Sequence, residues 1–139
     1  MAELNFDALK LSIAALEQGL EEHAQYPQLL TVRDGVIQRF EVAVDISQKL
    51  IRRVLQEVYQ MEPARIAKNA MREAAGMALI ADAERWIGHV NARNETSHIY
   101  DASKANAIFE RIPGFLPDST RPKTASSVWM CAWTAKRRG

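Results

Sequence analysis

The sequence lacks the residues that hold small secreted or metal-bound domains together. Its single cysteine, Cys131, cannot form an internal disulfide bond, and no spacing of cysteine and histidine resembles a zinc site. No apolar run approaches the roughly 20 residues that cross a membrane, and residues 1–25 are amphipathic, unlike a signal peptide. A glycine-rich phosphate loop is also missing. We therefore expect a cytoplasmic protein that uses no metal or other cofactor and does not contact a membrane.

An excess of charge of one sign is missing as well, although the charges are unevenly distributed. The 139 residues include 18 Lys and Arg and 17 Asp and Glu, which gives a net charge of +1. Residues 118–139 hold five basic residues and one acidic residue, so they carry +4 and the rest of the chain carries −3. Strong non-specific binding of nucleic acid requires many basic contacts, so any RNA chemistry in this chain would need a local site.

Glycine and proline are scarce before residue 113, whereas residues that favour helices abound. Apolar residues spaced by three and four positions predict helices over residues 4–25 and 31–59, a third from Pro63 to Gly76, a fourth from Asp82 into the low nineties, and a fifth after the N-cap Asp101. Pro113, Gly114 and Pro117 are expected to break the fifth helix, and no alternating stretch predicts a strand. The length fits one domain. We predict an all-α fold, an up-and-down bundle of four to five helices over residues 1–117, followed by a basic, poorly ordered tail over residues 118–139.

The helix expected over residues 31–59 has two distinct faces. Its apolar face is wider than one neighbouring helix needs, which favours a helix-mediated homodimer. A separate polar line includes Asp34, Glu41 and Asp45, which are candidate partner- or ligand-binding residues. Glu41 and Asp45, four residues apart, could orient a histidine or bind a metal. The simpler interpretation is a pair of solvated carboxylates on an exposed helical strip.

One short stretch concentrates reactive groups, the sequence RNETSHIYD at residues 93–101. Arg93 has a permanent charge and a planar fork that fits phosphate, and His98 can move a proton near neutral pH. Together they could cleave RNA without a metal, because His98 could remove the proton of a ribose 2′-hydroxyl while Arg93 stabilises charge on phosphorus. On an ideal helix the two point about 140° apart, so they converge only if the helix ends between them or a second copy completes the site. Thr96 and Ser97 favour such an end. A capped helix end without catalysis fits the spacing as well.

The HEPN superfamily has an Arg-x4–6-His motif that this chain resembles through Arg93, Asn94, Ser97, His98, Tyr100 and Asp101. More narrowly, the chain is similar to the nucleotidyltransferase substrate-binding protein family. Its residues 33–41 (RDGVIQRFE) resemble a second segment that recurs in that family. The likeness extends over about residues 4–116. The last helix of that family usually continues further, whereas Pro117 and Pro122 interrupt this chain.

The resemblance implies a small helical bundle that dimerises and is the partner of a minimal nucleotidyltransferase. Related members are ribonuclease toxins of toxin–antitoxin modules, whose arginine and histidine form a composite site across the dimer. The nucleotidyltransferase silences such toxins by attaching AMP to a tyrosine two residues after the histidine. By position, the resemblance makes Arg93 and His98 catalytic candidates, Asn94 a supporting one and Tyr100 the modification target. A non-catalytic substrate-binding or assembly subunit, and a plain helical adaptor, remain alternatives.

The remaining candidates have simpler interpretations. His89 is interpreted as a structural histidine at or partly below the surface, and His23 as a cation that stabilises the end of the first helix. Trp129 and Trp133 could stack on bases or pack elsewhere. Cys131 has no basic neighbour close in sequence that would make it a nucleophile.

Overall fold

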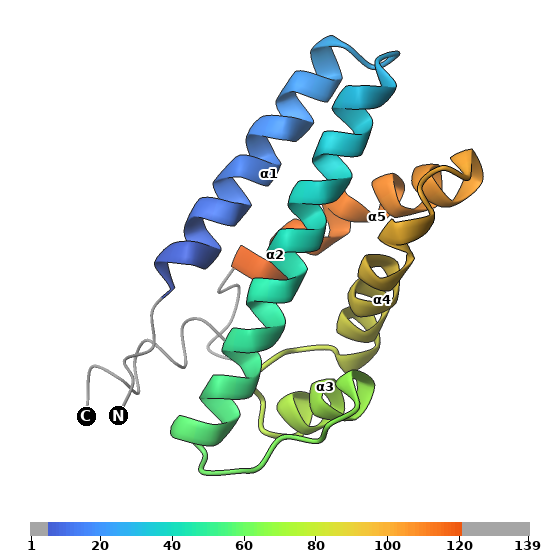
Figure 1. Ribbon diagram of the computed structural model, residues 1–139. Helices are drawn as coiled ribbons and strands as arrows, with labels where there is room; N and C mark the ends of the chain where they lie inside the picture. The colour runs from blue at the N-terminus through green and yellow to red at the C-terminus, as the bar shows by residue number, and fades with distance from the viewer. Residues whose placement is uncertain (1–5, 121–139) are drawn as a thin grey trace.

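The computed structural model describes residues 6–120, which form a bundle of helices (Figure 1). The elements are α1 (Asp7–Gln25), α2 (Leu30–Glu57), α3 (Ala67–Gly76), α4 (Ala83–Asn94), the short 3₁₀ helix η1 (Glu95–His98) and α5 (Ala102–Thr120). α1 and α2 form a long antiparallel pair, α4 lies beside α2, and α5 crosses behind α2 (Figure 1). No residue between 6 and 120 belongs to a β-strand, so the prediction of an all-α fold is confirmed.

α2 is the central element, in contact with α1, α3, α4 and α5. The apolar face predicted for this helix is buried, including Ile37, Phe40, Val44, Ile51 and Val54. Burial of each such side chain stabilises the fold by roughly 1.5–3 kcal/mol. The ring of Phe40 also packs edge-on against Phe115 of α5, with the ring centroids 5.3 Å apart. Because four helices of the same chain cover this face, its width does not require a second copy.

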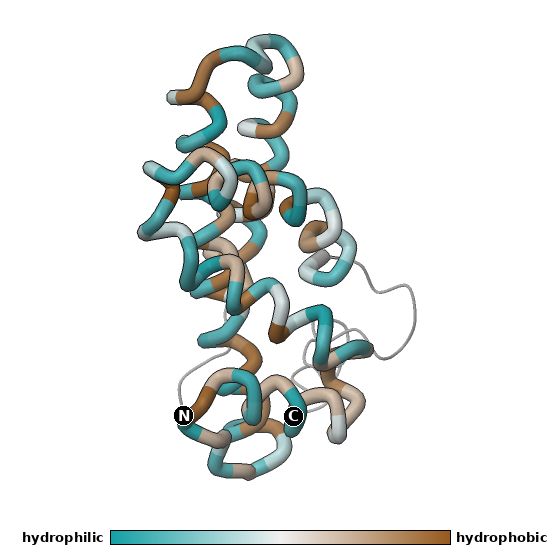
Figure 2. The backbone as a smooth tube through the Cα atoms, turned by 90° about the vertical axis from the view of Figure 1, so that its right-hand side faces the viewer, coloured by the Kyte–Doolittle hydropathy of each residue, from teal (hydrophilic) through white to brown (hydrophobic). Residues whose placement is uncertain are grey.

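Each helix is amphipathic, and Figure 2 shows hydrophilic and hydrophobic residues interleaved along the tube. The predicted starts of two helices are confirmed by their capping hydrogen bonds. The side chain of Asp82 accepts the backbone N–H of Arg85 at the start of α4, and Asp101 Oδ1 accepts that of Ser103 at the start of α5. No helix within residues 6–120 is both long and apolar enough to cross a membrane.

The start of α3 differs from the prediction, because Pro63 lies ahead of the helix and not in its first turn. Side chains form hydrogen bonds with the backbone N–H and carbonyl groups of the preceding segment and hold it in an irregular conformation. Arg52 Nη1 donates a hydrogen bond of 2.7 Å to the Ala64 carbonyl, and the Ala64 N–H donates one of 2.7 Å to Glu73 Oε1. These contacts replace the hydrogen bonds that a helical turn from Pro63 would have made. The predicted end at Gly76 is confirmed.

The expectation that Pro113, Gly114 and Pro117 break the fifth helix is wrong, because α5 continues through all three to Thr120. The two prolines lie one turn apart, and the residues between and after them that face the core are buried, Phe115 and Ser119 among them. A proline inside a helix costs about 3 kcal/mol, and burial of this face offsets that cost. The helix therefore brings Asp118, which the sequence placed in the tail, into the bundle. Trp129, Cys131 and Trp133 lie outside the described residues.

Candidate functional site

The RNETSHIYD stretch occupies the corner where α4 passes into η1 and α5 (Figure 1). α4 ends at Asn94, and a single 3₁₀ turn, Glu95–His98, follows it. The predicted end of the helix between Arg93 and His98 is therefore confirmed. The angle of about 140° expected on a continuous helix does not apply here, because the backbone changes its winding between the two residues.

Arg93 is bound by two carboxylates of α2. Its Nε lies 2.6 Å from Asp45 Oδ1, its Nη2 lies 3.0 Å from Asp45 Oδ2, and its Nη1 lies 3.2 Å from Glu41 Oε2. The hydrogen bonds to Asp45 raise the pKa of Arg93 further above its usual value. Glu41 and Asp45 are thus engaged with an arginine of α4, and the interpretation of a solvated pair is wrong. Three of the five guanidinium N–H donors are used in this way.

Thr96 joins η1 to the same cluster. Its side chain is buried, with the hydroxyl oxygen 2.5 Å from Glu41 Oε2 and 2.8 Å from the carbonyl oxygen of Arg93, so it donates to one of them at a time. Sequence reasoning gave Thr96 only a tendency to end the helix. Its buried position next to a polar cluster could not be inferred, because its partner Glu41 belongs to a distant segment of the chain.

His98 and Tyr100 form a second, more exposed group at the corner. His98 Nδ1 lies 3.4 Å from the hydroxyl oxygen of Tyr100, and the two rings meet edge to face. The Tyr100 side chain is 84% exposed. Asn94 is also exposed, at the last residue of α4. Within residues 6–120 of one chain, no hydrogen bond or ion pair joins Arg93 to His98.

A cavity of about 440 Å³ adjoins this corner, between the first half of α2 and η1. Two of the three ligand-binding candidates on α2, Asp34 and Glu41, line it together with Thr96 and Ile99. Asp34 also accepts two hydrogen bonds from the neighbouring Arg33, of 2.9 and 3.0 Å. The third candidate, Asp45, is not among the lining residues and serves Arg93 instead.

Residues 4–128 match the sequence model of a protein family described as "nucleotidyltransferase substrate binding protein like". The chain belongs to this family. The resemblance noted in the sequence is therefore confirmed for nearly the whole chain.

The sequences and structures of related proteins support the placement of this chain in the nucleotidyltransferase substrate-binding family. The chain is 32% identical over 129 residues to the probable ribonuclease HepT of Haemophilus influenzae, an alignment that covers 85% of this chain and 88% of that protein. Its fold is similar to a Haemophilus influenzae structure described as a substrate-binding domain of a nucleotidyltransferase (TM-score 0.73, 27% identity, covering 95% of this chain and 99% of the other). A crystal structure from Thermus thermophilus is also similar (TM-score 0.68, 28% identity, covering 80% and 92%).

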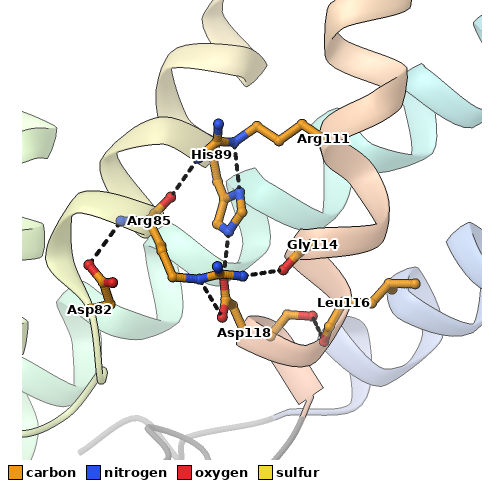
Figure 3. A network of polar contacts seen from close by, with 8 residues as sticks. Asp82, Arg85, His89, Arg111, Gly114, Leu116 and Asp118 are labelled. Atoms are coloured by element: carbon orange, nitrogen blue, oxygen red, sulfur yellow. Dashed lines mark hydrogen bonds and ion pairs between the residues drawn. The ribbon is translucent and has the colours of Figure 1, made fainter.

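This family member also contains a polar network between α4 and α5, centred on the buried His89 (Figure 3). His89 is 2% exposed; its Nε2 lies 2.7 Å from Asp118 Oδ2, and its Nδ1 accepts a 3.1 Å hydrogen bond from Arg111 Nε. Arg85 adds a 2.9 Å contact to the same Asp118 oxygen. Burial is the main cause of the lowered pKa of His89, so the ring is neutral and donates its Nε2–H to Asp118.

The interpretation of His89 as structural agrees with this position, but its expected place at or partly below the surface is wrong, because the ring is buried between α4 and α5. Asp118 and Arg111 belong to the helix that the sequence ended at Pro113. Elsewhere, His23 at the end of α1 packs against Phe109, with the ring centroids 4.3 Å apart. Within residues 6–120, no three His, Cys, Asp or Glu side chains are grouped so that they could hold a metal ion.

Proposed function

We propose that this chain is an endoribonuclease of the HEPN type and the partner subunit of a minimal nucleotidyltransferase. The observation that carries the proposal is the corner itself. Arg93 and His98 flank a true helix break, on an accessible edge of the bundle, in a chain that is 32% identical to a probable ribonuclease. A guanidinium and an imidazole are the groups that a metal-independent cleavage of RNA requires.

In the proposed reaction, His98 accepts the proton of a ribose 2′-hydroxyl. The 2′-oxygen forms a bond to phosphorus, the bond from phosphorus to the 5′-oxygen breaks, and the leaving oxygen takes up a proton from water. The products are a 2′,3′-cyclic phosphate and a 5′-hydroxyl. Arg93 stabilises the negative charge that develops on the phosphoryl oxygens. Asn94, exposed one residue after Arg93, supports the substrate from the end of α4.

The arrangement of Arg93 and His98 in one chain favours a site built from two copies. Arg93 faces Asp45 and Glu41, so this cluster carries a net charge of −1, which repels phosphate. Two of the five N–H donors of Arg93 remain for a substrate. A second copy would add its own −1 cluster, so the case for two copies comes from geometry: within residues 6–120 of one chain no hydrogen bond or ion pair joins Arg93 to His98, and a second chain can place its histidine beside that arginine. We therefore include a homodimer in the proposal, with the two α4–α5 corners facing each other.

Control of the activity is assigned to Tyr100. Its hydroxyl is exposed and lies 3.4 Å from His98 Nδ1. The tyrosine oxygen would attack the α-phosphorus of ATP bound by the nucleotidyltransferase, pyrophosphate would leave, and the phenolic proton would pass to a base. The attached AMP would place a bulky anion beside His98 and exclude RNA by charge and volume.

The cleavage proposal is tested with purified protein and total RNA in the presence of EDTA. We expect the natural protein to cut RNA and leave cyclic phosphate ends, and His98→Ala and Arg93→Ala to reduce the rate at least ~100-fold, the usual size of a lost acid–base or electrostatic contribution. His23→Ala, at the end of α1, is the matched histidine control and should retain full activity. Equal cleavage by all four proteins, or by none, contradicts the proposal.

The second candidate function is a non-catalytic subunit that presents Tyr100 or a ligand to the nucleotidyltransferase. The −1 charge of the Arg93 cluster favours it, because a cluster of that charge repels the phosphates of RNA. Incubation with the nucleotidyltransferase and ATP, followed by intact-mass measurement, separates the possibilities. We expect a mass increase by AMP units that is absent in Tyr100→Phe, with loss of RNA cleavage in parallel. Modification without any cleavage by the unmodified protein supports the non-catalytic subunit.

A further inference from the structure

The cavity between α2 and η1 has a wall in common with the proposed phosphate site. Glu41 lines the cavity and also lies 3.2 Å from Arg93 Nη1. The volume of the cavity, about 440 Å³, is within the range of small-molecule sites. A group bound here would therefore lie next to a phosphate held by Arg93.

Gly35 leaves the helix backbone open on the side of the cavity. Glycine disfavours a helix interior more than any residue except proline, so its presence within α2 needs a reason. A Cβ atom added at Gly35 meets no atom within 4 Å, whereas one added at Gly19 lies 3.1 Å from the Val36 side chain. Packing inside the chain thus explains a small residue at Gly19 but not at Gly35. A bare helix surface permits the close approach of a flat ligand.

The polar groups of the cavity are mostly hydrogen-bond acceptors. Asp34 uses Oδ1 for Arg33, and Glu41 uses Oε2 for Arg93 and Thr96. Within residues 6–120, Oδ2 of Asp34, Oε1 of Glu41 and the amide of Gln38 have no hydrogen-bond partner. The lining contains no Lys, Arg or His. The cavity therefore suits a neutral group with N–H donors and disfavours a phosphate.

Apolar side chains complete the lining. The half-buried Ile99 provides an apolar contact for the face of a ring, with Ile37 behind it in the core. Asp34 and Gln38 are one helical turn apart, so their acceptors lie along one edge. Guanine has adjacent N–H donors on its ring nitrogen and its exocyclic amine, whereas adenine, cytosine and uracil have no two adjacent donors along this edge. We infer that the cavity binds a guanine base of the RNA, stacked on the open helix surface at Gly35. The assignment to RNA rests on the proposed ribonuclease function.

Binding is measured on the full chain with the four nucleosides, by titration followed with NMR, so the readout does not depend on cleavage. We expect guanosine to bind at least tenfold more tightly than adenosine, cytidine or uridine. Gly35→Leu fills the open surface and should reduce guanosine affinity at least tenfold. Gly76→Leu, where an added Cβ also meets nothing within 4 Å, is the matched control at the end of α3 and should bind as before. Asp34→Asn should weaken guanosine binding and leave adenosine binding unchanged.

The thermal stability of Gly35→Ala tests whether the space beside this position is open. Gly35→Ala should raise Tm by roughly 2–5 °C, because alanine is the better helix former and nothing obstructs its methyl group. The mass of Gly35→Leu in solution is determined by light scattering. If guanosine affinity falls and the oligomer dissociates in this variant, the cavity is covered by a second copy of the chain and the inference is wrong.

The remaining outcomes distinguish this inference from the proposed function. Cleavage of short RNAs with and without a single guanine, and competition by free guanosine, test whether the base belongs to the substrate. Cleavage without guanine preference and without guanosine binding overturns the guanine site while the ribonuclease stands. Selective guanosine binding by a protein that cuts no RNA supports the guanine site and contradicts the proposed ribonuclease function.

Discussion

His89 is the most deeply buried titratable side chain described between residues 6 and 120, and its hydrogen bonds fix its protonation state. Its Nε2–H points at Asp118 and its Nδ1 accepts from Arg111, so no ring nitrogen is available for a second proton without loss of a contact. Burial, the largest cause of the lowered pKa of His89, also favours the neutral ring. Asp118 opposes this shift and favours a charged ring, whereas Arg111 and Arg85 disfavour one, and the pKa of His89 is lowered as the result. The native bundle therefore requires a neutral histidine at this position.

This requirement predicts a pH dependence of stability. A folded-state pKa below the unfolded value of 6.5 means that the unfolded chain binds the proton more readily. The contribution of His89 is therefore complete above that pH and declines as the pH falls below it. We expect the free energy of unfolding, measured in urea, to decrease from about pH 7.5 to about pH 5.5 in the natural protein.

His89→Gln provides the control, since glutamine can donate to Asp118 and accept from Arg111 but does not titrate. The difference in unfolding free energy between the natural protein and this variant should shrink as the pH is lowered. A difference that stays constant over the same pH range would mean that His89 does not take part in the acid response.

At the scale of elements, the end of α5 is held by polar contacts as well as by apolar packing. Asp118 binds His89 and Arg85 of α4, and Arg85 Nη2 also donates a 3.0 Å hydrogen bond to the Gly114 carbonyl. These contacts join the last turns of α5 to the middle of α4 (Figure 3). They explain how a helix with two internal prolines remains attached to the bundle at its end.

Asp118→Ala should lower the free energy of unfolding by about 1–3 kcal/mol, because it leaves the buried Nε2–H of His89 without an acceptor. Glu84→Ala, also at a carboxylate that pairs with an arginine, is the comparison. It removes an exposed 3.5 Å ion pair between α4 and Arg72 of α3, which is worth at most about 1 kcal/mol. Both values are obtained from urea unfolding at neutral pH. If the two variants are equally stable, the polar contacts do not hold α5 in place.

The elements that the sequence predicts well are those with a local cause. The apolar period of α2 and the capping carboxylates of α4 and α5 depend on residues within a few positions of one another, and all are confirmed. The continuation of α5 through Pro113 and Pro117 has a tertiary cause, the burial of Phe115 against α2 and α4, which no local pattern contains. Proline chemistry alone therefore gives the wrong helix end.

The candidate site also combines features with a local cause and features with a tertiary cause. The stretch at residues 93–101 is contiguous, so the position of the helix break could be predicted from it. The contact between Arg93 and Asp45 joins residues 48 positions apart, and a polar line on one helix does not specify its partner on another. The cavity at Gly35 depends on the packing of η1 against α2, which could not be inferred from the spacing of glycine or apolar residues.

At the scale of the whole molecule, Arg93 and His98 belong to different local clusters of one chain. Arg93 points to α2 through Asp45 and Glu41, and His98 lies with Tyr100 on the exposed side of the corner. If a phosphodiester is to meet both groups, the histidine of one chain can act with the arginine of another. In a two-fold symmetric dimer, each such composite site occurs twice.

Subunit mixing tests this arrangement directly. Arg93→Ala and His98→Ala chains carrying different affinity tags are co-expressed, and the mixed dimer is purified through both tags. A site shared between chains leaves one of the two composite sites intact in the mixed dimer, so about half of the natural cleavage rate should return although each parent is inactive. A site complete within one chain gives no recovery, because every chain in the mixture lacks either its arginine or its histidine. A mixed dimer made from two differently tagged His98→Ala chains sets the background, and recovery no greater than this background would show that each corner works alone.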